Sequence, residues 1–355
     1  MTDSDRVHSL LTRIILSLFL PGRISSRVRR SVPGSSEGKR MVRQGKRTRI
    51  VRLRVIAAIL LGVGIAGAQQ PGAPSLRFLI VSDQGGRASA NQRSVAEAMG
   101  KEAERINAQF VISGGDNFHE DGIPAATDPR WLTEFEEVYS SPALQIPWYP
   151  SLGNHDYRGN VEGEIGYSGQ STRWKLHSRY YTQTERIDDS TSMLIVHLDT
   201  SPFVQKYWTE SSVYHMEGQD PKRQLHWLDS VLTVSRAEWT MVIGHHAIYF
   251  AEPGKGDSKE MIDQVLPMLK RHRVPLYVSG HYHFMQHLRR DGMDFVICGG
   301  GANAGAVAPR DDVLFGVRSL GFLSVIVTPI ELRLNMIDPD GMILHSVYLQ
   351  PAPSK

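Results

Sequence analysis

The fold of this chain is most constrained by short apolar runs that alternate with amphipathic segments. Apolar runs of this length suit strands that are buried on both faces of a sheet. The first run, at residues 76–83, predicts a strand, and a helix is predicted after it at 94–106, where Val95, Met99 and Ile106 share one face. Strands that alternate with helices predict an α/β fold with an open sheet.

The alternation continues along the chain. Helices are predicted at 128–139, which opens with an Asp cap and a proline, and at 224–232 and 261–272. The remaining strands are predicted at 110–116, 148–156, 192–200, 239–246, 275–283 and 294–300. The segment 322–349 predicts antiparallel strands with a hairpin turn at Asp340-Gly341. We therefore expect a single catalytic domain at 76–350.

Residues 1–68 form a basic leader that is typical of an export signal. Its apolar run at 55–68 has about the length of a signal's hydrophobic part and is too short for a comfortable membrane span. Small residues end this run, so we expect a signal at 41–68, cleavage before Gln69, and a linker at 69–75. Residues 1–40 are expected to be disordered or not translated. The expected location is secreted or periplasmic, and the alternative is an uncleaved signal that anchors the protein in a membrane.

The charge of the chain is uneven. Residues 1–68 hold 14 of the 40 Lys and Arg but only 3 of the 37 Asp and Glu, so the remainder carries a net charge of −8. A nucleic-acid partner needs a basic face, and we expect none here. The single cysteine, Cys298, excludes an intramolecular disulfide and lies in an apolar strand, so it is expected to be buried. The oligomeric state is not predicted.

Polar residues follow five of the predicted strands at the point where each strand ends. In an open α/β sheet these positions meet at the carboxyl edge, where ligands bind. Carboxylate, amide and imidazole groups together favour Fe, Mn, Zn or Co over Ca. The sequence therefore predicts a metal site, formed by Asp83; Asp116 and His119; Asn154, His155 and Asp156; His245 and His246; and His281 and His283.

The order of these motifs, D, GD, GNH, GH and GHxH, resembles that of the calcineurin-like metallophosphoesterases. Within that group the chain is similar to the purple acid phosphatases, especially the small tartrate-resistant type. The likeness extends through WYPSLGNHDYRGN, GHYHFMQH and ICGGGANAG and covers roughly residues 76–349. It implies a four-layer α/β/β/α sandwich with two metal ions at one end. These would be iron with a second Fe, Zn or Mn ion, or two divalent ions.

The resemblance also implies a role for each site residue. One metal would be bound by Asp83, Asp116, His283 and the residue at 119, and the other by Asn154, His245 and His281, with Asp116 bridging the two. A hydroxide on the metals would attack a phosphate ester in line. Asn154 and His155 would contact the substrate, and His155 would stabilise the phosphoryl group or protonate the leaving oxygen.

For three of these residues the sequence allows two different roles. Asp156 is expected to orient His155, but it could instead cap the loop after Asn154. His246 could reach the substrate or could pack beside His245. His119 stands where the purple enzymes have their chromophoric tyrosine, and it either binds metal or lines the pocket while water completes the metal's coordination. If imidazole replaces phenolate, Fe(III) is less stabilised and the protein should have little colour.

Two further departures concern the substrate. Pro253 stands where the mammalian relatives carry a histidine, and Gln84 replaces an aromatic residue after the first aspartate. We expect an exported phosphatase that acts on small phosphate monoesters and that does not stay associated with a membrane after cleavage. The rivals are a phosphodiesterase or nucleotide hydrolase of the same superfamily and a catalytically silent phosphate- or partner-binding module.

Overall fold

The computed structural model of the protein describes residues 74–351. The leader, its signal and most of the predicted linker lie outside these described residues. Within 74–351, no helix combines the length and the apolar character that crossing a membrane requires.

The first sheet has six strands and mixes parallel with antiparallel pairing. Its strand order is β13 (Ile343–Leu349), β12 (Leu332–Ile337), β11 (Phe322–Val327), β1 (Leu76–Val81), β2 (Phe110–Gly114) and β3 (Trp148–Ser151). Strands β1, β2 and β3 are parallel, whereas β11, β12 and β13 form an antiparallel meander. The predicted hairpin is confirmed, because β12 and β13 are joined at residues 338–342 and Gly341 has φ of 82°.

The second sheet has seven strands. Its strand order is β10 (Val313–Val317), β8 (Met285–Arg290), β9 (Met293–Cys298), β7 (Leu276–Ser279), β6 (Trp239–Gly244), β5 (Ser192–Leu198) and β4 (Tyr181–Arg186). The central strands β5, β6, β7 and β9 are parallel. The edge strands β4 and β10 were not predicted, because β4 is mostly polar and half-exposed, and the apolar sequence of β10 is only five residues long and is interrupted by Gly316.

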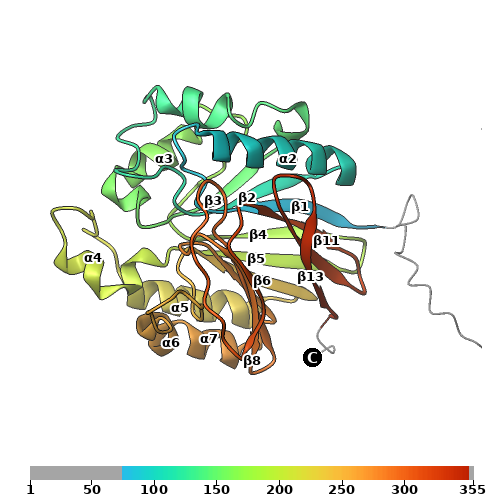
Figure 1. The fold of residues 1–355 in the computed structure, drawn as a ribbon. Helices are drawn as coiled ribbons and strands as arrows, with labels where there is room; N and C mark the ends of the chain where they lie inside the picture. The colour runs from blue at the N-terminus through green and yellow to red at the C-terminus, as the bar shows by residue number, and fades with distance from the viewer. Residues whose placement is uncertain (1–73, 352–355) are drawn as a thin grey trace, which may run out of the picture. The chain divides into compact units, whose positions relative to one another are not determined.

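Helices cover the outer face of each sheet (Figure 1). On the first sheet lie α2 (Ala90–Ile106), a π-helical turn (Trp131–Glu136) and α3 (Val161–Tyr167). On the second lie α5 (Pro221–Val234), α6 (Lys259–Gln264) and α7 (Leu266–Arg271). A short helix, α4 (Gln205–Thr209), and single 3₁₀ turns at 142–144, 156–158 and 201–203 complete the elements.

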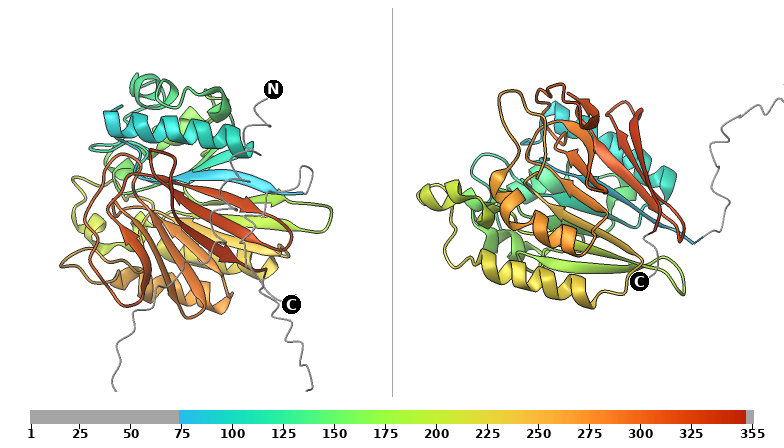
Figure 2. Two further views of the ribbon diagram at one scale, coloured as in Figure 1. Left: turned by 45° about the vertical axis from the view of Figure 1, so that its right-hand side comes forward. Right: turned by 90° about the horizontal axis from the view of Figure 1, so that it is seen from below.

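Three apolar cores separate the four layers, and the views of Figure 2 show the same stacking. In β1, Leu79 and Val81 face α2, whereas Phe78 and Ile80 face the other sheet. In β5, Ile195 faces that central core and Val196 faces α5. Successive side chains of these strands therefore point alternately to a helix layer and to the other sheet, and both faces are apolar. The result is an α/β/β/α sandwich, which confirms the expected fold class. Cys298 is buried between the sheets.

Two predicted helices differ from the structure. The helix predicted at 261–272 is split into α6 and α7, because Pro267 lies in the first turn of α7 and cannot donate a backbone hydrogen bond. The segment 128–139 contains a π-helical turn in place of a regular α-helix, although its aromatic residues are buried as the apolar pattern suggested.

Candidate dinuclear metal centre

The chain turns sharply where the strands meet the site. Asp83 and Asp116 follow β1 and β2, and His281 follows β7. All three have left-handed backbone conformations, with φ of 57°, 51° and 68°. Left-handed geometry is unfavourable for residues with a Cβ atom and concentrates at functional sites. Glycines allow the turns to meet. A Cβ atom on Gly153 would overlap Asp116, and one on Gly280 would overlap Ser82 and Asp83.

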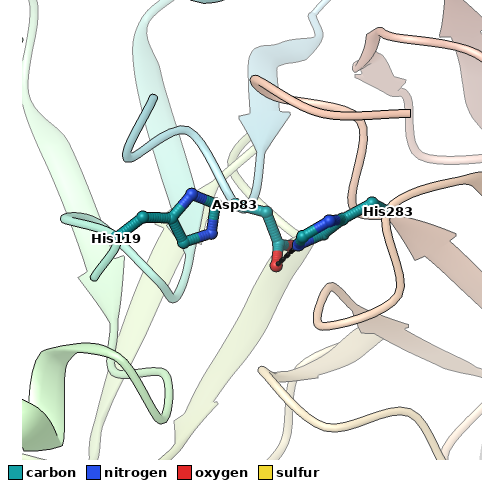
Figure 3. A group of neighbouring side chains, drawn as sticks. All are labelled: Asp83, His119 and His283. Atoms are coloured by element: carbon teal, nitrogen blue, oxygen red, sulfur yellow. Dashed lines mark ion pairs between the residues drawn. The ribbon is translucent and has the colours of Figure 1, made fainter. Parts of the chain in front are cut away.

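Asp83, His119 and His283 form one group of possible metal ligands. One ligand atom from each of the three side chains lies within 4.8 Å of the other two. His283 Nε2 is 3.5 Å from Asp83 Oδ1, and the His281 backbone N–H donates to Asp83 Oδ2 at 3.0 Å. Figure 3 shows the two imidazoles on opposite sides of the Asp83 carboxylate. The group combines residues from the ends of β1, β2 and β7.

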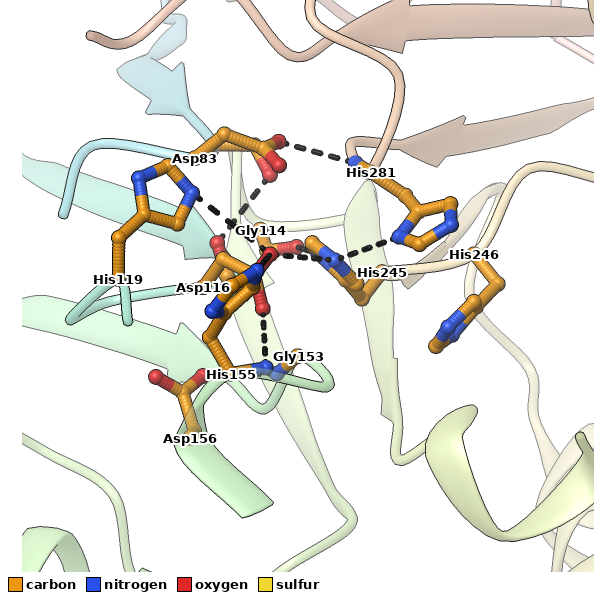
Figure 4. Close-up of polar contacts among 12 residues, drawn as sticks. Asp83, Gly114, Asp116, His119, Gly153, His155, Asp156, His245, His246 and His281 are labelled. Atoms are coloured by element: carbon orange, nitrogen blue, oxygen red, sulfur yellow. Dashed lines mark hydrogen bonds and ion pairs between the residues drawn. The ribbon is translucent and has the colours of Figure 1, made fainter. Parts of the chain in front are cut away.

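A second group contains Asp116, His245 and His281, whose ligand atoms also lie within 4.8 Å of one another. His245 Nε2 is 3.2 Å from Asp116 Oδ2 and 3.3 Å from His281 Nδ1. Asp116 Oδ2 also lies 3.7 Å from His119 Nε2, which belongs to the first group. Asp116 therefore lies between the two groups, as Figure 4 shows.

Three buried polar atoms of the site have no hydrogen-bond partner among the described residues: Asp83 Oδ1, His119 Nε2 and Asn154 Oδ1. Buried polar atoms are almost always paired, so these three are suited to a ligand that the protein itself does not supply. Carboxylate, imidazole and amide donors fit two transition-metal ions. The residues present therefore fit a dinuclear centre.

The electrostatics of the site also favour bound positive charge. Burial alone would raise the pKa of Asp116, but His245, His155 and His119 outweigh it and hold that pKa well below the usual range. Burial would lower the pKa of His245, yet Asp116 and Asp83 raise it to about 9. Burial lowers the pKa of His119 and lowers that of His281 to about 3, so both imidazoles are neutral and able to coordinate metal.

His155 lies beside Asp116. Its backbone N–H donates to Asp116 Oδ1 at 2.8 Å, and its Nε2 lies 4.0 Å from Asp116 Oδ2. The other ring nitrogen, Nδ1, lies 2.9 Å from the carbonyl oxygen of Glu120. A carbonyl can only accept, so Nδ1 carries the proton and Nε2 faces the centre.

The expectation that Asp156 orients the His155 ring is wrong for this structure. Asp156 is fully buried, and its carboxylate accepts from the backbone N–H groups of Gly153 and Phe118 at 2.8 and 3.2 Å. Among the described residues, no hydrogen bond joins this carboxylate to the His155 ring, whose Nδ1 lies against the Glu120 carbonyl instead. The alternative, in which Asp156 caps the loop around Asn154, matches these bonds.

His246 is also not presented to a substrate. Its Nδ1 lies 2.8 Å from the Thr200 hydroxyl and its Nε2 lies 2.9 Å from the Tyr207 hydroxyl. Both nitrogens are thus occupied, and burial holds the pKa of His246 well below its usual value. The alternative packing role beside His245 fits, with the two rings perpendicular at 5.1 Å.

A buried polar network behind the metal ligands escaped the sequence analysis. The Asn117 amide donates to the Ser151 carbonyl, Asp156 and Glu164 at 3.0, 3.3 and 3.0 Å. Gln84 joins it by donating to Asn117 Oδ1 at 3.1 Å. Asn117 lies next to a predicted ligand and could have been singled out, but nothing in the sequence marks Glu164, which comes from α3. The network ties together the loops that carry Asp116 and Asn154.

Comparisons with known proteins agree with this geometry. The model of the calcineurin-like phosphoesterase family matches residues 76–285. The chain is 37% identical to purple acid phosphatase 7 of Arabidopsis thaliana over 283 residues, which is 76% of this chain and 85% of the relative. It is 32% identical to tartrate-resistant acid phosphatase type 5 of Sus scrofa over 304 residues, which is 78% of this chain and 87% of the relative.

Solved structures share the fold at lower identity. GAP50, described as the anchor in the inner membrane complex of Plasmodium, superposes with a TM-score of 0.70 at 22% identity, covering 79% of this chain and 90% of that one. The purple acid phosphatase PPD1 from yellow lupin (Lupinus luteus) seeds superposes with a TM-score of 0.59 at 16% identity, covering 78% and 54%.

Proposed function

The chain belongs to the calcineurin-like phosphoesterases and, within them, to the purple acid phosphatase family, and on this premise we propose that it hydrolyses phosphate monoesters. The observation that carries the proposal is the pair of ligand groups around Asp116, with the Nε2 atom of His155 directed at the same carboxylate. Asp116 belongs to one group and lies 3.7 Å from His119 of the other, so the two adjacent groups suit a centre that holds both oxygens of an in-line displacement.

The residues that would hold the metals follow from the two groups. Asp83, His119 and His283 would hold one ion; Asn154, His245 and His281 would hold the other; and Asp116 would serve both. When bound, such a pair neutralises phosphoryl oxygens and makes a nucleophile available from water near neutral pH. We propose iron with a second Fe, Zn or Mn ion, or two divalent ions.

His155 performs the chain's own part of the reaction. The Glu120 carbonyl keeps the Nδ1 proton in place, so a protonated ring has one further N–H, at Nε2, and that N–H faces the centre. From there it can donate a hydrogen bond to the phosphoryl group or a proton to the leaving oxygen. The hydrogen bonds that the buried Asp156 carboxylate accepts from the Gly153 and Phe118 N–H groups keep the loop of His155 in position.

Assays of the metal-loaded protein test this function. We expect p-nitrophenyl phosphate to be hydrolysed faster than its bis ester. Asp116→Asn should lose activity roughly 100-fold or more and lose bound metal, because even groups that only support a ligand change affinity or activity 10–100-fold. His155→Ala should lose about 10²–10⁴-fold in activity but keep its metal.

The matched control is His226→Asn, since His226 is an exposed histidine on α5 and should leave both properties unchanged. Preference for the bis ester would support the phosphodiesterase alternative. A protein that binds phosphate but turns over neither ester would be a silent binding module.

We also propose that the protein is exported through its basic leader and acts outside the cytoplasm without remaining in a membrane. The support is the positive segment followed by the apolar run and the small residues at 66–68. Mass spectrometry of the full chain expressed in a bacterial host should find a mature form that begins at Gln69 in the periplasmic or secreted fraction. An intact amino terminus in the membrane fraction would instead support an uncleaved anchor.

A further inference from the structure

Arg158 has an unusual environment beside the catalytic histidine. The next two arginines along the chain, Arg173 and Arg179, pair with Glu136 and Glu162 respectively. Arg158 is half-buried, yet among the described residues no carboxylate lies within 4.0 Å of its guanidinium. Its hydrogen-bond acceptors are neutral, namely the Tyr214 hydroxyl at 2.8 Å and the Glu120 carbonyl at 3.4 Å. Its Nε atom is buried without a partner.

The position of this cation is fixed relative to His155. Both residues belong to one 3₁₀ turn, in which the Arg158 backbone N–H donates to the His155 carbonyl at 3.0 Å. Their side chains meet again at the Glu120 carbonyl oxygen, which lies 2.9 Å from His155 Nδ1. The carboxylate of Glu120 itself lies toward Arg87, at 4.0 Å. The guanidinium therefore lies on the side of the imidazole that faces away from Asp116.

A continuous arc of contacts joins Arg158 to the second group of metal ligands. The rings of His281 and His246 are 4.5 Å apart, and the Tyr207 hydroxyl lies 2.9 Å from His246 Nε2. The Tyr207 ring packs 4.4 Å from that of Tyr214, which binds Arg158. Burial raises the pKa of Tyr207, and the charge of Asp116 raises it further, so the arc lies within electrostatic range of the centre.

Arg158 is the only permanent charge in this arc. Burial keeps His246 neutral by lowering its pKa, and keeps Tyr207 neutral by raising its pKa. The guanidinium also lies over the Tyr214 ring, with its Cζ atom 5.2 Å from the ring centroid, so its described partners are all neutral and the cation remains able to pair with an anion bound beside it. The planar guanidinium is well suited to phosphate or carboxylate oxygens, which it can contact through two N–H groups.

We propose that Arg158 determines specificity by binding a second anionic group on the substrate, carried by the leaving group. This inference rests on the proposed phosphatase function. The transferred phosphoryl group would lie between Asp116 and His155 Nε2, and the leaving oxygen would receive its proton from that nitrogen. A group attached to this oxygen extends past the imidazole, and Arg158 lies on that side. The preferred substrates are phosphate compounds whose leaving group is itself an anion.

Two substrates that differ in the leaving group test the proposal. Hydrolysis of pyrophosphate releases an anionic phosphate as the leaving group, whereas hydrolysis of phenyl phosphate releases a neutral phenol. Arg158→Gln should lower kcat/KM for pyrophosphate by about 10–100-fold, mainly through KM, as expected for one charged hydrogen-bonded contact. The same variant should change kcat/KM for phenyl phosphate less than about threefold, and Arg158→Lys should restore part of the loss, because it keeps the charge.

Two control variants distinguish an effect of the Arg158 charge on the substrate from a structural effect on the loop that carries His155. Arg179→Gln removes a nearby arginine that already has a carboxylate partner, and should leave the ratio of the two kcat/KM values unchanged. Tyr214→Phe removes the hydroxyl acceptor but keeps the cation, and should also preserve that ratio. Equal losses on both substrates in Arg158→Gln would show a structural role only and overturn the proposal.

Binding measurements keep the result independent of turnover. Isothermal titration of the full metal-loaded protein with methylenediphosphonate, a pyrophosphate analogue that cannot be hydrolysed, and with orthophosphate should show tighter binding of the analogue, and this preference should be lost in Arg158→Gln. A wild-type protein without this preference would contradict the role of Arg158 even if it is an active phosphatase. A wild-type protein that keeps the preference but hydrolyses neither pyrophosphate nor phenyl phosphate would contradict the phosphatase function alone. Thermal melts show whether each variant folds.

Discussion

At the scale of single residues, His119 is the position that most distinguishes this site. Its Nε2 atom is buried without a hydrogen-bond partner and lies 3.7 Å from Asp116 Oδ2. Its ring is also 5.0 Å from that of His155 and 5.5 Å from that of His283. Burial lowers its pKa, so the ring is neutral and able to bind a metal ion.

His119→Tyr should introduce colour. The iron-loaded wild-type protein should have at most a weak visible band, because imidazole is neutral and stabilises Fe(III) less than phenolate does. The tyrosine variant should gain a charge-transfer band in the visible spectrum of the iron-loaded protein. His119→Phe is the control, since it has a ring of similar size but no ligand atom. An iron-loaded tyrosine variant without the band would refute ligation at position 119.

Gly153→Ala should weaken metal binding. A methyl group at this position would overlap the backbone and carboxylate of Asp116, so the two loops would have to separate. We expect metal affinity to fall about 10–100-fold, as for other groups that support ligands, measured by competition with a chelator. Gly256→Ala is the matched control, because nothing lies within 4 Å of its added methyl group. Equal affinities in the two variants would contradict this packing argument.

The sequence predicted the residue types of the site well and their bonds less well. The two ligand groups lie together because each of their residues follows a strand, and strand ends are visible in the apolar pattern. The partner of Asp156 was missed, because the backbone N–H of Phe118 comes from another loop. The bonds of His246 were missed for the same reason, since Tyr207 approaches from α4.

At the scale of elements, continuous apolar strands in the interior of the sheets were predictable, whereas the edge strands β4 and β10 and the shortest helices were not. Helices α3 and α4 are only 7 and 5 residues long, so they show no helical periodicity that could be recognised. They nevertheless supply Glu164 and Tyr207 to the surroundings of the site. Short elements whose position depends on tertiary contacts are where prediction from a single sequence ends.

The contact between β8 and β13 predicts a dependence of stability on pH. His287 Nδ1 lies 2.9 Å from His345 Nε2, and His287 Nε2 lies 2.8 Å from Asp294, which also pairs with Arg289. Burial and then His287 lower the pKa of His345 below 6.5. A histidine whose pKa is lower in the folded protein than in the unfolded chain stabilises the fold fully at pH values above its unfolded-state pKa. That stabilisation is lost as the pH falls through the folded-state pKa.

His345→Phe should therefore make the melting temperature less dependent on pH between about pH 7 and 5, the range in which histidine titrates. The new ring can stack on Phe315 as the imidazole does, at 4.7 Å. Differential scanning calorimetry across this range measures the effect, with the exposed His226→Phe as control. Parallel curves for wild type and His345→Phe would contradict the prediction.

At the scale of the described domain, the metal centre lies where the two sheets meet. Asp83, Asp116 and Asn154 come from the first sheet, whereas His245, His281 and His283 come from the second. Between the sheets lies an apolar core that includes Phe78 on β1 and Met241 on β6. Bound metal would add a second connection between the sheets, at their carboxyl edge.

Removal of metal should lower the stability of the whole domain. A ligand present at 100 times its Kd adds about 2.7 kcal/mol, which for a domain of this size corresponds to roughly 5–10 °C in Tm. We expect dialysis against a chelator to lower Tm by this amount and added metal to restore it. Asp116→Asn should respond to neither treatment. An unchanged Tm in the wild-type protein would argue against a metal-dependent connection between the sheets.

The pairing of β1 with β11 has a consequence for the order of events when the protein is made. Leu76, at the start of the described region, lies opposite Val327, so the first strand remains an open edge until the last meander has been synthesised. The neighbour of β1 on its other side, β2, is available much earlier. A nascent chain can therefore assemble half of its first sheet but not enclose it. Catalytic competence should appear only after residues 322–349 have emerged, and a chain shortened before them should remain inactive although it contains every metal ligand.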